Sequence, residues 1–308
     1  MIGTTKGYFL LIENSLELFH GKIPGGGNKA TNDIVYCRSA NCYFLESGNK
    51  ILRKDLNGHD PYEFMPLGGN NINLKGNILL NSEVNQRLIV FQKYNHFSMI
   101  NPLTKKRETT VDFGLRYDEH YDNCLIGEKE ESFAILARAW KDACILLFDS
   151  KFRRRSKGCS YFGRLELELE TSENEVPCSI SCGPLGKYLF FSTNNNTSKF
   201  ALRIFVLRVA DGVVAAQTNH FGKLSIRMLS PLACYGYVGD HLIFLSLPRI
   251  RSETTFLYDF DVKNGEVKEL KSKRTKYLGH SPVKIVRCGE HFYYTSDLGK
   301  VMRLKLVF

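Results

Sequence analysis

The chain lacks the local signatures of common enzyme and metal-site classes. Its 308 residues contain no Cys-x-x-Cys pair, no Gly-x4-Gly-Lys-Ser/Thr phosphate loop and no Gly-x-Ser-x-Gly nucleophile elbow. Zinc-ribbon, thioredoxin-like, nucleotide-hydrolysing and serine-hydrolase assignments therefore lose their main support. The sequence predicts a protein that is not an enzyme, with no catalytic residue, no cofactor and no metal site.

Long apolar runs and a secretion leader are also missing. No apolar run approaches the roughly 20 residues that span a bilayer, and residues 1–6 lack a basic segment followed by a long apolar stretch. The nine cysteines are odd in number, and most lie inside apolar segments, as reduced and buried thiols do. We expect an intracellular protein without a membrane span. The sequence does not distinguish the cytoplasm from the nucleus.

Acidic residues are outnumbered by basic ones. Lys and Arg total 42 against 32 Asp and Glu, which gives a formal net charge of +10. Such an excess favours association with acidic surfaces or polyanions. An equally good interpretation is a protein that is merely basic.

Helical periodicity is nearly absent, and strand patterns replace it. Most segments alternate or stay apolar for five to nine residues and are then stopped by Gly, Asn or Asp, which indicates strands joined by tight turns. A hydrophobic fraction of 43%, with 21 Phe and 15 Tyr, supplies ample core material. The pattern predicts an all-β fold of antiparallel hairpins.

One unit of four strands recurs along the chain. Its clearest copy has strands near 179–183, 187–192, 202–207 and 212–216, and the following copy matches it element by element. The first strands of the copies begin near Ile34, Ile78, Leu125, Ser179, Tyr235 and Lys284. Successive starts lie 44 to 56 residues apart, close to the roughly 40 to 50 residues of a four-stranded propeller blade.

The repeat predicts a single closed β-propeller domain over residues 1–308, with about six four-stranded blades. The blades are expected near 33–67, 77–114, 123–169, 176–219, 233–270 and 283–308. The last copy is one strand short, so the N-terminal segment 1–24 is expected to close the ring by adding a strand to the C-terminal blade. The alternative is that this segment belongs to a seventh blade.

The unit resembles the WD40-like β-propeller superfamily over nearly the whole chain. Residues 145–149, 204–212 and 257–267 look like the third strand, turn and fourth strand of such repeats. The Gly-His start and Trp-Asp end are missing from every copy, Trp140 ends a second strand instead, and Gly279-His280 stands alone. The resemblance therefore implies a divergent propeller whose faces or rim bind other macromolecules. The network that stabilises the strands of typical repeats depends on those missing residues, so the resemblance does not extend to it.

Two basic runs are the candidate partner-binding or polyanion-binding residues. They comprise Lys105, Lys106, Arg107, Arg153, Arg154, Arg155 and Lys157. Each run follows a third strand, so the repeat places both on equivalent turns at one face of adjacent blades. The alternative is that charges in turns keep the rim soluble and block edge pairing. A third cluster, residues 118–122, holds three carboxylates and one His in an expected loop, and we interpret it as solvated.

The leading functional hypothesis is a non-catalytic scaffold that binds other protein subunits within a larger intracellular complex. The alternative is an RNA- or DNA-associated propeller subunit of a ribonucleoprotein that uses a basic face. An enzyme with an unrecognised site in a central channel is the third reading.

Overall fold

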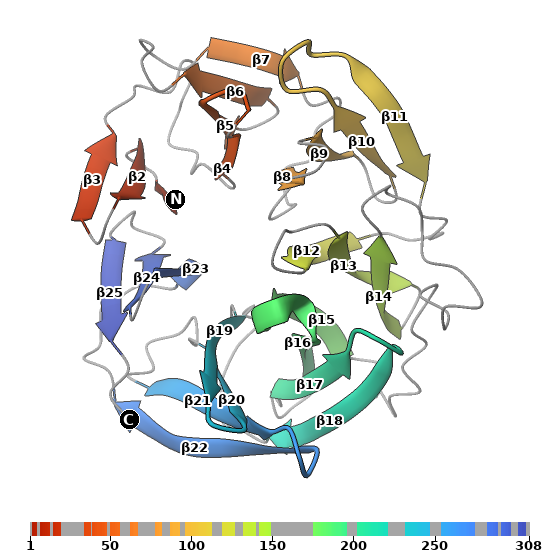
Figure 1. Cartoon of the computed structure of the whole chain (residues 1–308), viewed down its shortest axis with the longest axis vertical. Helices are drawn as coiled ribbons and strands as arrows, with labels where there is room; N and C mark the ends of the chain where they lie inside the picture. The colour runs from red at the N-terminus through yellow and green to blue at the C-terminus, as the bar shows by residue number, and fades with distance from the viewer. Residues whose placement is uncertain are drawn as a thin grey trace. The chain divides into compact units, whose positions relative to one another are not determined.

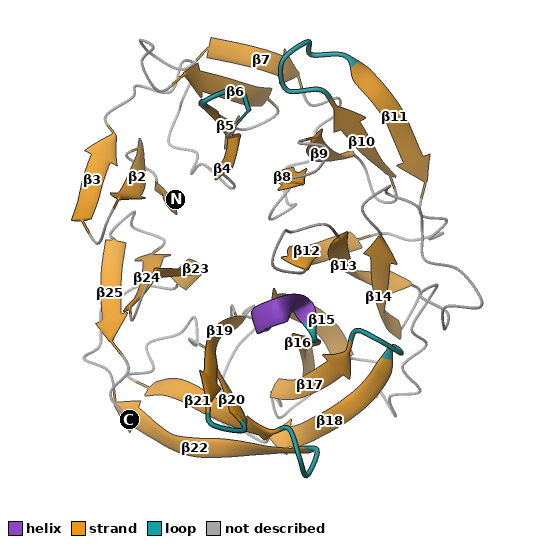
Figure 2. Cartoon of the chain, viewed as in Figure 1, coloured by secondary structure: helices purple, strands orange, loops and turns teal. Residues whose placement is uncertain are grey.

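The protein is described from a computed structural model, in which antiparallel strands dominate (Figures 1 and 2). The structure describes residues 2–4, 7–12, 15–19, 34–37, 39–47, 50–55, 62–66, 78–81, 87–92, 96–112, 119–126, 132–139, 142–148, 175–195, 202–220, 232–246, 254–274, 282–288, 291–296 and 301–305. Within these ranges the strands form seven sheets, each of three or four strands. The prediction of an all-β antiparallel fold is confirmed.

Contacts divide the chain into two compact units, residues 1–115 with 286–308 and residues 116–285. Three sheets lie wholly in the first unit. Their strands are β1 (Ile2–Thr4), β2 (Gly7–Ile12) and β3 (Ser15–Phe19); β4 (Ile34–Cys37), β5 (Cys42–Ser47), β6 (Lys50–Asp55) and β7 (Tyr62–Pro66); and β8 (Ile78–Asn81), β9 (Arg87–Gln92), β10 (His96–Ile100) and β11 (Arg107–Asp112). A further sheet contains β23 (Pro282–Cys288), β24 (His291–Ser296) and β25 (Val301–Lys305).

Three sheets lie in the second unit. Their strands are β12 (Glu119–Ile126), β13 (Ser132–Ala139) and β14 (Asp142–Phe148); β15 (Glu175–Cys182), β16 (Tyr188–Asn195), β17 (Leu202–Arg208) and β18 (Val213–His220); and β19 (Leu232–Val238), β20 (His241–Ser246), β21 (Thr254–Asp261) and β22 (Glu266–Arg274). The fourth strand expected in the copy at 123–169 falls outside the described residues. Figure 2 shows a short helical turn at 184–186. No described helix is long and apolar enough to cross a membrane.

The N-terminal strands do not complete the C-terminal sheet, contrary to the sequence prediction. β1, β2 and β3 pair with one another, and β23, β24 and β25 form a separate three-stranded sheet. The reason is that Ile2–Thr4 folds back on the next strand, with Ile2 opposite Phe9 and Thr4 opposite Gly7. The N-terminal segment thereby gains a third strand and becomes a sheet of its own.

The sheet β15–β18 is apolar on both faces, which explains its near-continuous apolar runs. One face packs Leu189, Phe191 and Phe205 against the sheet β12–β14, and the other packs Phe190 against the sheet β19–β22. The Phe190 and Phe244 rings stack with centroids 4.4 Å apart. A sheet buried on both faces cannot show the apolar and polar alternation of a half-solvated one.

In the first unit, sheets β4–β7 and β8–β11 share one core. Phe44 and Phe64 meet edge to face with centroids 4.8 Å apart, and they pack with Leu88, Val90 and Ile100 from the neighbouring sheet. This core holds the outer strand β7 and the connection between β10 and β11 at fixed positions beside each other. Polar residues of β7 and of the connection between β10 and β11 therefore lie on one surface.

Candidate interaction surface

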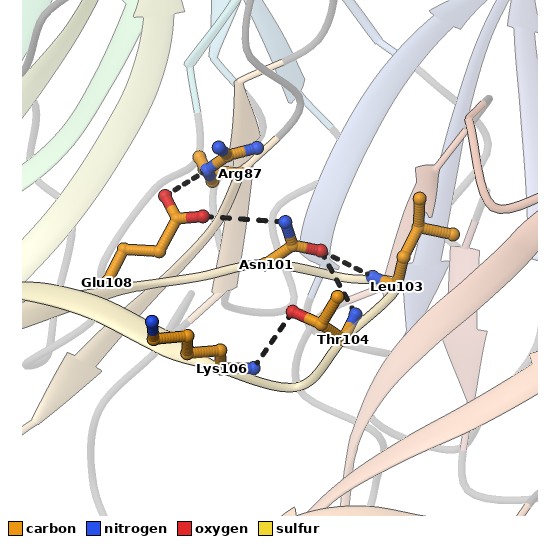
Figure 3. A network of polar contacts seen from close by, with 6 residues as sticks. All are labelled: Arg87, Asn101, Leu103, Thr104, Lys106 and Glu108. Carbon is orange, nitrogen blue, oxygen red and sulfur yellow. Dashed lines mark hydrogen bonds and ion pairs between the residues drawn. The ribbon is translucent and has the colours of Figure 1, made fainter.

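The turn between β10 and β11 is a rigid loop organised by one asparagine. The Asn101 Oδ1 accepts hydrogen bonds from the backbone N–H groups of Leu103 at 2.9 Å and Thr104 at 3.0 Å. The Lys105 N–H donates to the Asn101 carbonyl at 2.9 Å, and the Asn101 N–H donates to the Lys106 carbonyl at 2.9 Å. Figure 3 shows the two bonds from the Asn101 side chain to Leu103 and Thr104. The loop therefore has a defined shape before any partner binds.

A charged pair fixes this loop to the strands that flank it. Glu108 forms an ion pair with Arg87 of β9, and the Asn101 Nδ2 donates to its second carboxylate oxygen at 3.4 Å (Figure 3). Glu108 is the extra residue of a β-bulge, because Met99 pairs with Thr109 while Ile100 pairs with Arg107. Bulges re-aim side chains. The bulge here explains how the Glu108 side chain, although it belongs to β11, contacts Asn101 in the loop.

Lys105 has a backbone conformation that ordinarily suits glycine. Its φ is +61°, and at the matching places of two other third-to-fourth-strand turns stand Gly212 with φ +72° and Gly265 with φ +68°. All three N–H groups donate to the carbonyl four residues earlier at 2.9 Å. A side chain in this region costs about 1–2 kcal/mol. The chain bears that cost at Lys105, whose side chain has contacts that a glycine would lack.

The Lys105 side chain joins the loop to strand β7 of the neighbouring sheet. Its Nζ lies 5.7 Å from the Tyr62 ring centroid and 5.3 Å from that of Phe64, within the range of a cation–π interaction. Arg53 of β6 adds a second link, because its guanidinium donates to the Pro102 carbonyl at 3.2 Å. The loop and the start of β7 thus form one continuous surface.

Two large apolar side chains lie open on this surface. Tyr62 is 42% exposed and Leu103 is 58% exposed. The Tyr62 hydroxyl points to Asp55, 3.5 Å away, and burial of its phenol raises the pKa of Tyr62. Tyr62 is therefore neutral at physiological pH.

Some charged side chains near this turn form ion pairs with one another, and others do not. Lys50 neutralises Glu63 at 2.6 Å, Arg53 neutralises Asp55 at 2.8 Å, and Arg87 pairs with Glu108. Lys105, Lys106 and Arg107 are exposed. Within the described part of the chain, none of these three makes an ion pair with a carboxylate. We name the set Tyr62, Leu103, Lys105, Lys106 and Arg107 the basic turn surface.

The basic turn surface contains three of the seven site residues predicted from the sequence. Lys105, Lys106 and Arg107 lie between the third and fourth strands of their sheet. The second run, residues 153–157, lies outside the described residues. Tyr62 and Leu103 were missed, because no sequence pattern shows that the start of β7 packs beside this turn. The only sequence features that could have suggested them are a Leu within a turn and a Tyr at the start of a strand.

Two other pairs of polar side chains are weaker candidates for a functional site. Cys37 and Cys42 face each other across the β4–β5 turn and are fully buried. The His241 ring nitrogen Nδ1 lies 2.9 Å from Asp259 Oδ1 on the sheet β19–β22. Among the described residues, no group of three or more His, Cys, Asp or Glu is arranged to hold a metal ion.

No protein-family model matches the sequence, and no curated protein matches it. Solved structures do match. One chain of the mitotic checkpoint complex superposes with a TM-score of 0.59 at 8% identity, over 89% of this chain and 73% of that one. A catalytically inactive virginiamycin B lyase from Staphylococcus aureus, crystallised with Quinupristin, gives 0.58 at 12% identity, over 89% and 80%. The N-terminal domain of Nup159 gives 0.53 at 12% identity, over 88% and 74%.

These structures share one fold with this chain. The chain has a β-propeller fold. At 8–12% identity the likeness shows the fold alone, and propellers with this fold include both members of complexes and a lyase. Function has to be argued from the propeller's own surface.

Proposed function

We propose that this propeller is a non-catalytic scaffold that binds a protein subunit of a larger intracellular complex through the basic turn surface. The observation that carries the proposal is the charge imbalance among the described residues, because the carboxylates near Lys105, Lys106 and Arg107 form ion pairs there and these three cations do not. Exposed Tyr62 and Leu103 beside them supply the apolar contact that interface centres use.

Two further observations support a scaffold in a complex. One chain of the mitotic checkpoint complex has this fold over 89% of the present chain, which is a likeness of fold. Six cysteines in the described strands are free thiols and not halves of disulfides, which supports a reducing intracellular location: Cys37, Cys42, Cys124, Cys178, Cys182 and Cys234.

We also infer that the seven sheets are blades of one closed propeller domain, the seven-bladed alternative that the sequence left open. Residues 1–115 and 286–308 belong to one compact unit, so both ends of the chain are held together. Within that unit, β1 lies beside β24 of the last sheet. This proximity supports a ring that closes where the first sheet, β1–β3, lies beside the last sheet, β23–β25, without a strand shared between them.

Affinity capture tests the scaffold proposal. The wild-type chain and a Lys106→Glu/Arg107→Glu variant, both tagged, would be captured from cell extract, and their bound proteins quantified. We expect specific partners to be lost from the variant and retained by Lys187→Glu, which reverses an exposed cation of the other compact unit. Equal partner sets for the variant and the wild type would contradict the use of this surface.

The nucleic-acid alternative rests on the same three cations, which phosphates would also satisfy. The capture experiment separates the two, because treatment of the extract with nuclease removes partners that are held through RNA or DNA. Partners that survive nuclease and disappear in the variant support the scaffold proposal.

A further inference from the structure

The basic turn surface also indicates the chemistry of its partner, an inference that rests on the proposed function. Lys105, Lys106 and Arg107 are consecutive cations without an ion-pair partner among the residues that the structure describes, and the nearby carboxylates of Glu63 and Glu108 already have cationic partners. A partner with carboxylates would gain charge-assisted hydrogen bonds without displacing an existing pair. The partner is therefore anionic.

The exposed Leu103 side chain indicates that the partner makes an apolar contact in addition to the charged ones. It is 58% exposed at the tip of the turn, while its own N–H is bonded to Asn101. Its backbone is thereby fixed, so covering the side chain costs little ordering entropy. An apolar side chain of the partner, placed among its carboxylates, would pack on Leu103 and the exposed part of Tyr62.

The aromatic residues favour a peptide over a nucleic acid. Single-stranded nucleic acids bind by stacking bases on open ring faces. Here the Lys105 Nζ lies over the rings of both Tyr62 and Phe64, and Phe64 is only 5% exposed. The Lys105 side chain therefore already lies over one face of each ring, whereas carboxylates need only the cations.

The geometry points to an acidic peptide segment as the partner, with Asp or Glu side chains contacting Lys105, Lys106 and Arg107 and a Leu or Phe between them packing on Leu103. Lys105 has a central place in this arrangement. It is the residue that replaces the glycine of the equivalent turns Arg208–Gly212 and Asp261–Gly265.

Fluorescence anisotropy tests this proposal on the full chain. The probe is a fluorescein-labelled peptide of repeated Glu-Leu-Asp triplets. Its comparison probes are the Gln-Leu-Asn peptide, the Glu-Ser-Asp peptide and a single-stranded RNA of the same length. We expect the acidic, Leu-containing peptide to bind tightest and to weaken as salt rises, because exposed charges are screened.

Variants assign the binding to the surface. Lys106→Glu/Arg107→Glu should weaken the acidic peptide about tenfold or more, since like charges oppose it. Lys105→Gly should weaken it while keeping the turn, and Lys105→Arg should restore it. Lys187→Glu is the matched control and should bind like the wild type. Circular dichroism and melting of each variant show that the fold is intact.

Three outcomes would overturn the proposal. RNA that binds more tightly than every peptide and loses affinity in Lys106→Glu/Arg107→Glu would assign the surface to nucleic acid. Equal binding of the Leu- and Ser-containing acidic peptides would remove the role of Leu103. Absence of peptide binding, with cell partners still lost from the captured variant, would reject the acidic peptide and leave the scaffold proposal standing.

Discussion

Lys105 shows how one side chain can be kept in a costly backbone conformation. Gly212 and Gly265 adopt nearly the same φ at the matching position of their turns without strain from a Cβ atom. Lys105 offsets its strain in part by lying over two aromatic rings, a contact that contributes about 0.5–1 kcal/mol at an exposed site. The balance predicts different effects for two substitutions at this residue.

Lys105→Gly should leave the free energy of unfolding within about 0.5 kcal/mol of wild type, because relief of strain offsets the lost cation–π contact and the greater freedom of glycine when unfolded. Lys105→Ala keeps the strain and loses the contact, so it should be less stable than the glycine variant by about 1 kcal/mol. Urea unfolding of the three proteins measures the difference. An alanine variant as stable as the glycine variant would show that the turn is not strained at this residue.

Cys37 and Cys42 form a coupled pair at the end of β4 and the start of β5. The hydrogen bond from Cys42 lowers the pKa of Cys37 to about 6, ahead of the opposing effect of burial, and the same bond raises the pKa of Cys42. Between pH 6 and 9 the folded chain therefore binds fewer protons here than the unfolded one. Stability should rise with pH in this window, and above pH 9 the raised pKa of Cys42 should reverse the trend.

Cys37→Ser tests this pair, because serine has nearly the same size and does not titrate. Urea unfolding from pH 6 to 9 in reducing buffer should show the wild type gaining up to about 1.4 kcal/mol per pH unit relative to the variant. Parallel stability curves for the two proteins would mean that Cys37 keeps an ordinary thiol pKa.

At the scale of the strand, buried hydroxyls in two sheets have opposite surroundings. The Ser192 hydroxyl of β16 is buried without a hydrogen-bond partner among the described residues. The Ser98 hydroxyl of β10 is equally buried but lies 3.1 Å from the Thr110 hydroxyl of β11, its direct cross-strand neighbour. Removing the first loses no hydrogen bond, whereas removing the second does.

Ser192→Ala should leave stability unchanged or raise it by up to about 1 kcal/mol, and Ser98→Ala should lower it by about 0.5–1.5 kcal/mol. The two variants are controls for each other, because both delete one oxygen atom from a fully buried strand position. Thermal and urea unfolding measure both. A loss of stability in Ser192→Ala equal to that in Ser98→Ala would place a bonded water beside Ser192.

Strands were predictable where apolar runs are long, and less so where polar residues extend a strand by pairing with the next one. The run at 187–192 corresponds to β16, and the run at 202–207 corresponds to β17. The cluster at 118–122 was expected in a loop, but β12 begins at Glu119, because its polar residues pair along β13. Likewise the fifth blade was expected to end near residue 270, but β22 continues to Arg274, with Lys273 and Arg274 opposite Thr255 and Thr254.

The candidate surface was predictable only in part. Lys105 to Arg107 could be placed in a turn from the local repeat. The partnership of Lys105 with Tyr62 and Phe64 depends on how two sheets pack, and no local pattern encodes it. Whether this surface binds a partner stays a prediction.

At the scale of the whole molecule, the proposed seven-bladed closure can be tested in solution. A compact single domain of this length has a radius of gyration of about 19 Å. Small-angle X-ray scattering of the wild type should give a value close to this if the ring is closed. A markedly larger value would mean that the two compact units separate.

Deletion of residues 1–19 removes the first sheet, β1–β3, and tests its part in closure. We expect the radius of gyration to increase and the melting temperature to fall, because loss of a blade exposes the apolar faces of its neighbours and leaves the ring open. Replacing exposed Lys187 by Glu serves as the control and should change neither quantity. A deleted chain that stays as compact and as stable as the wild type would show that the first sheet is an appendage, and the six-bladed prediction would then be the better account of the ring.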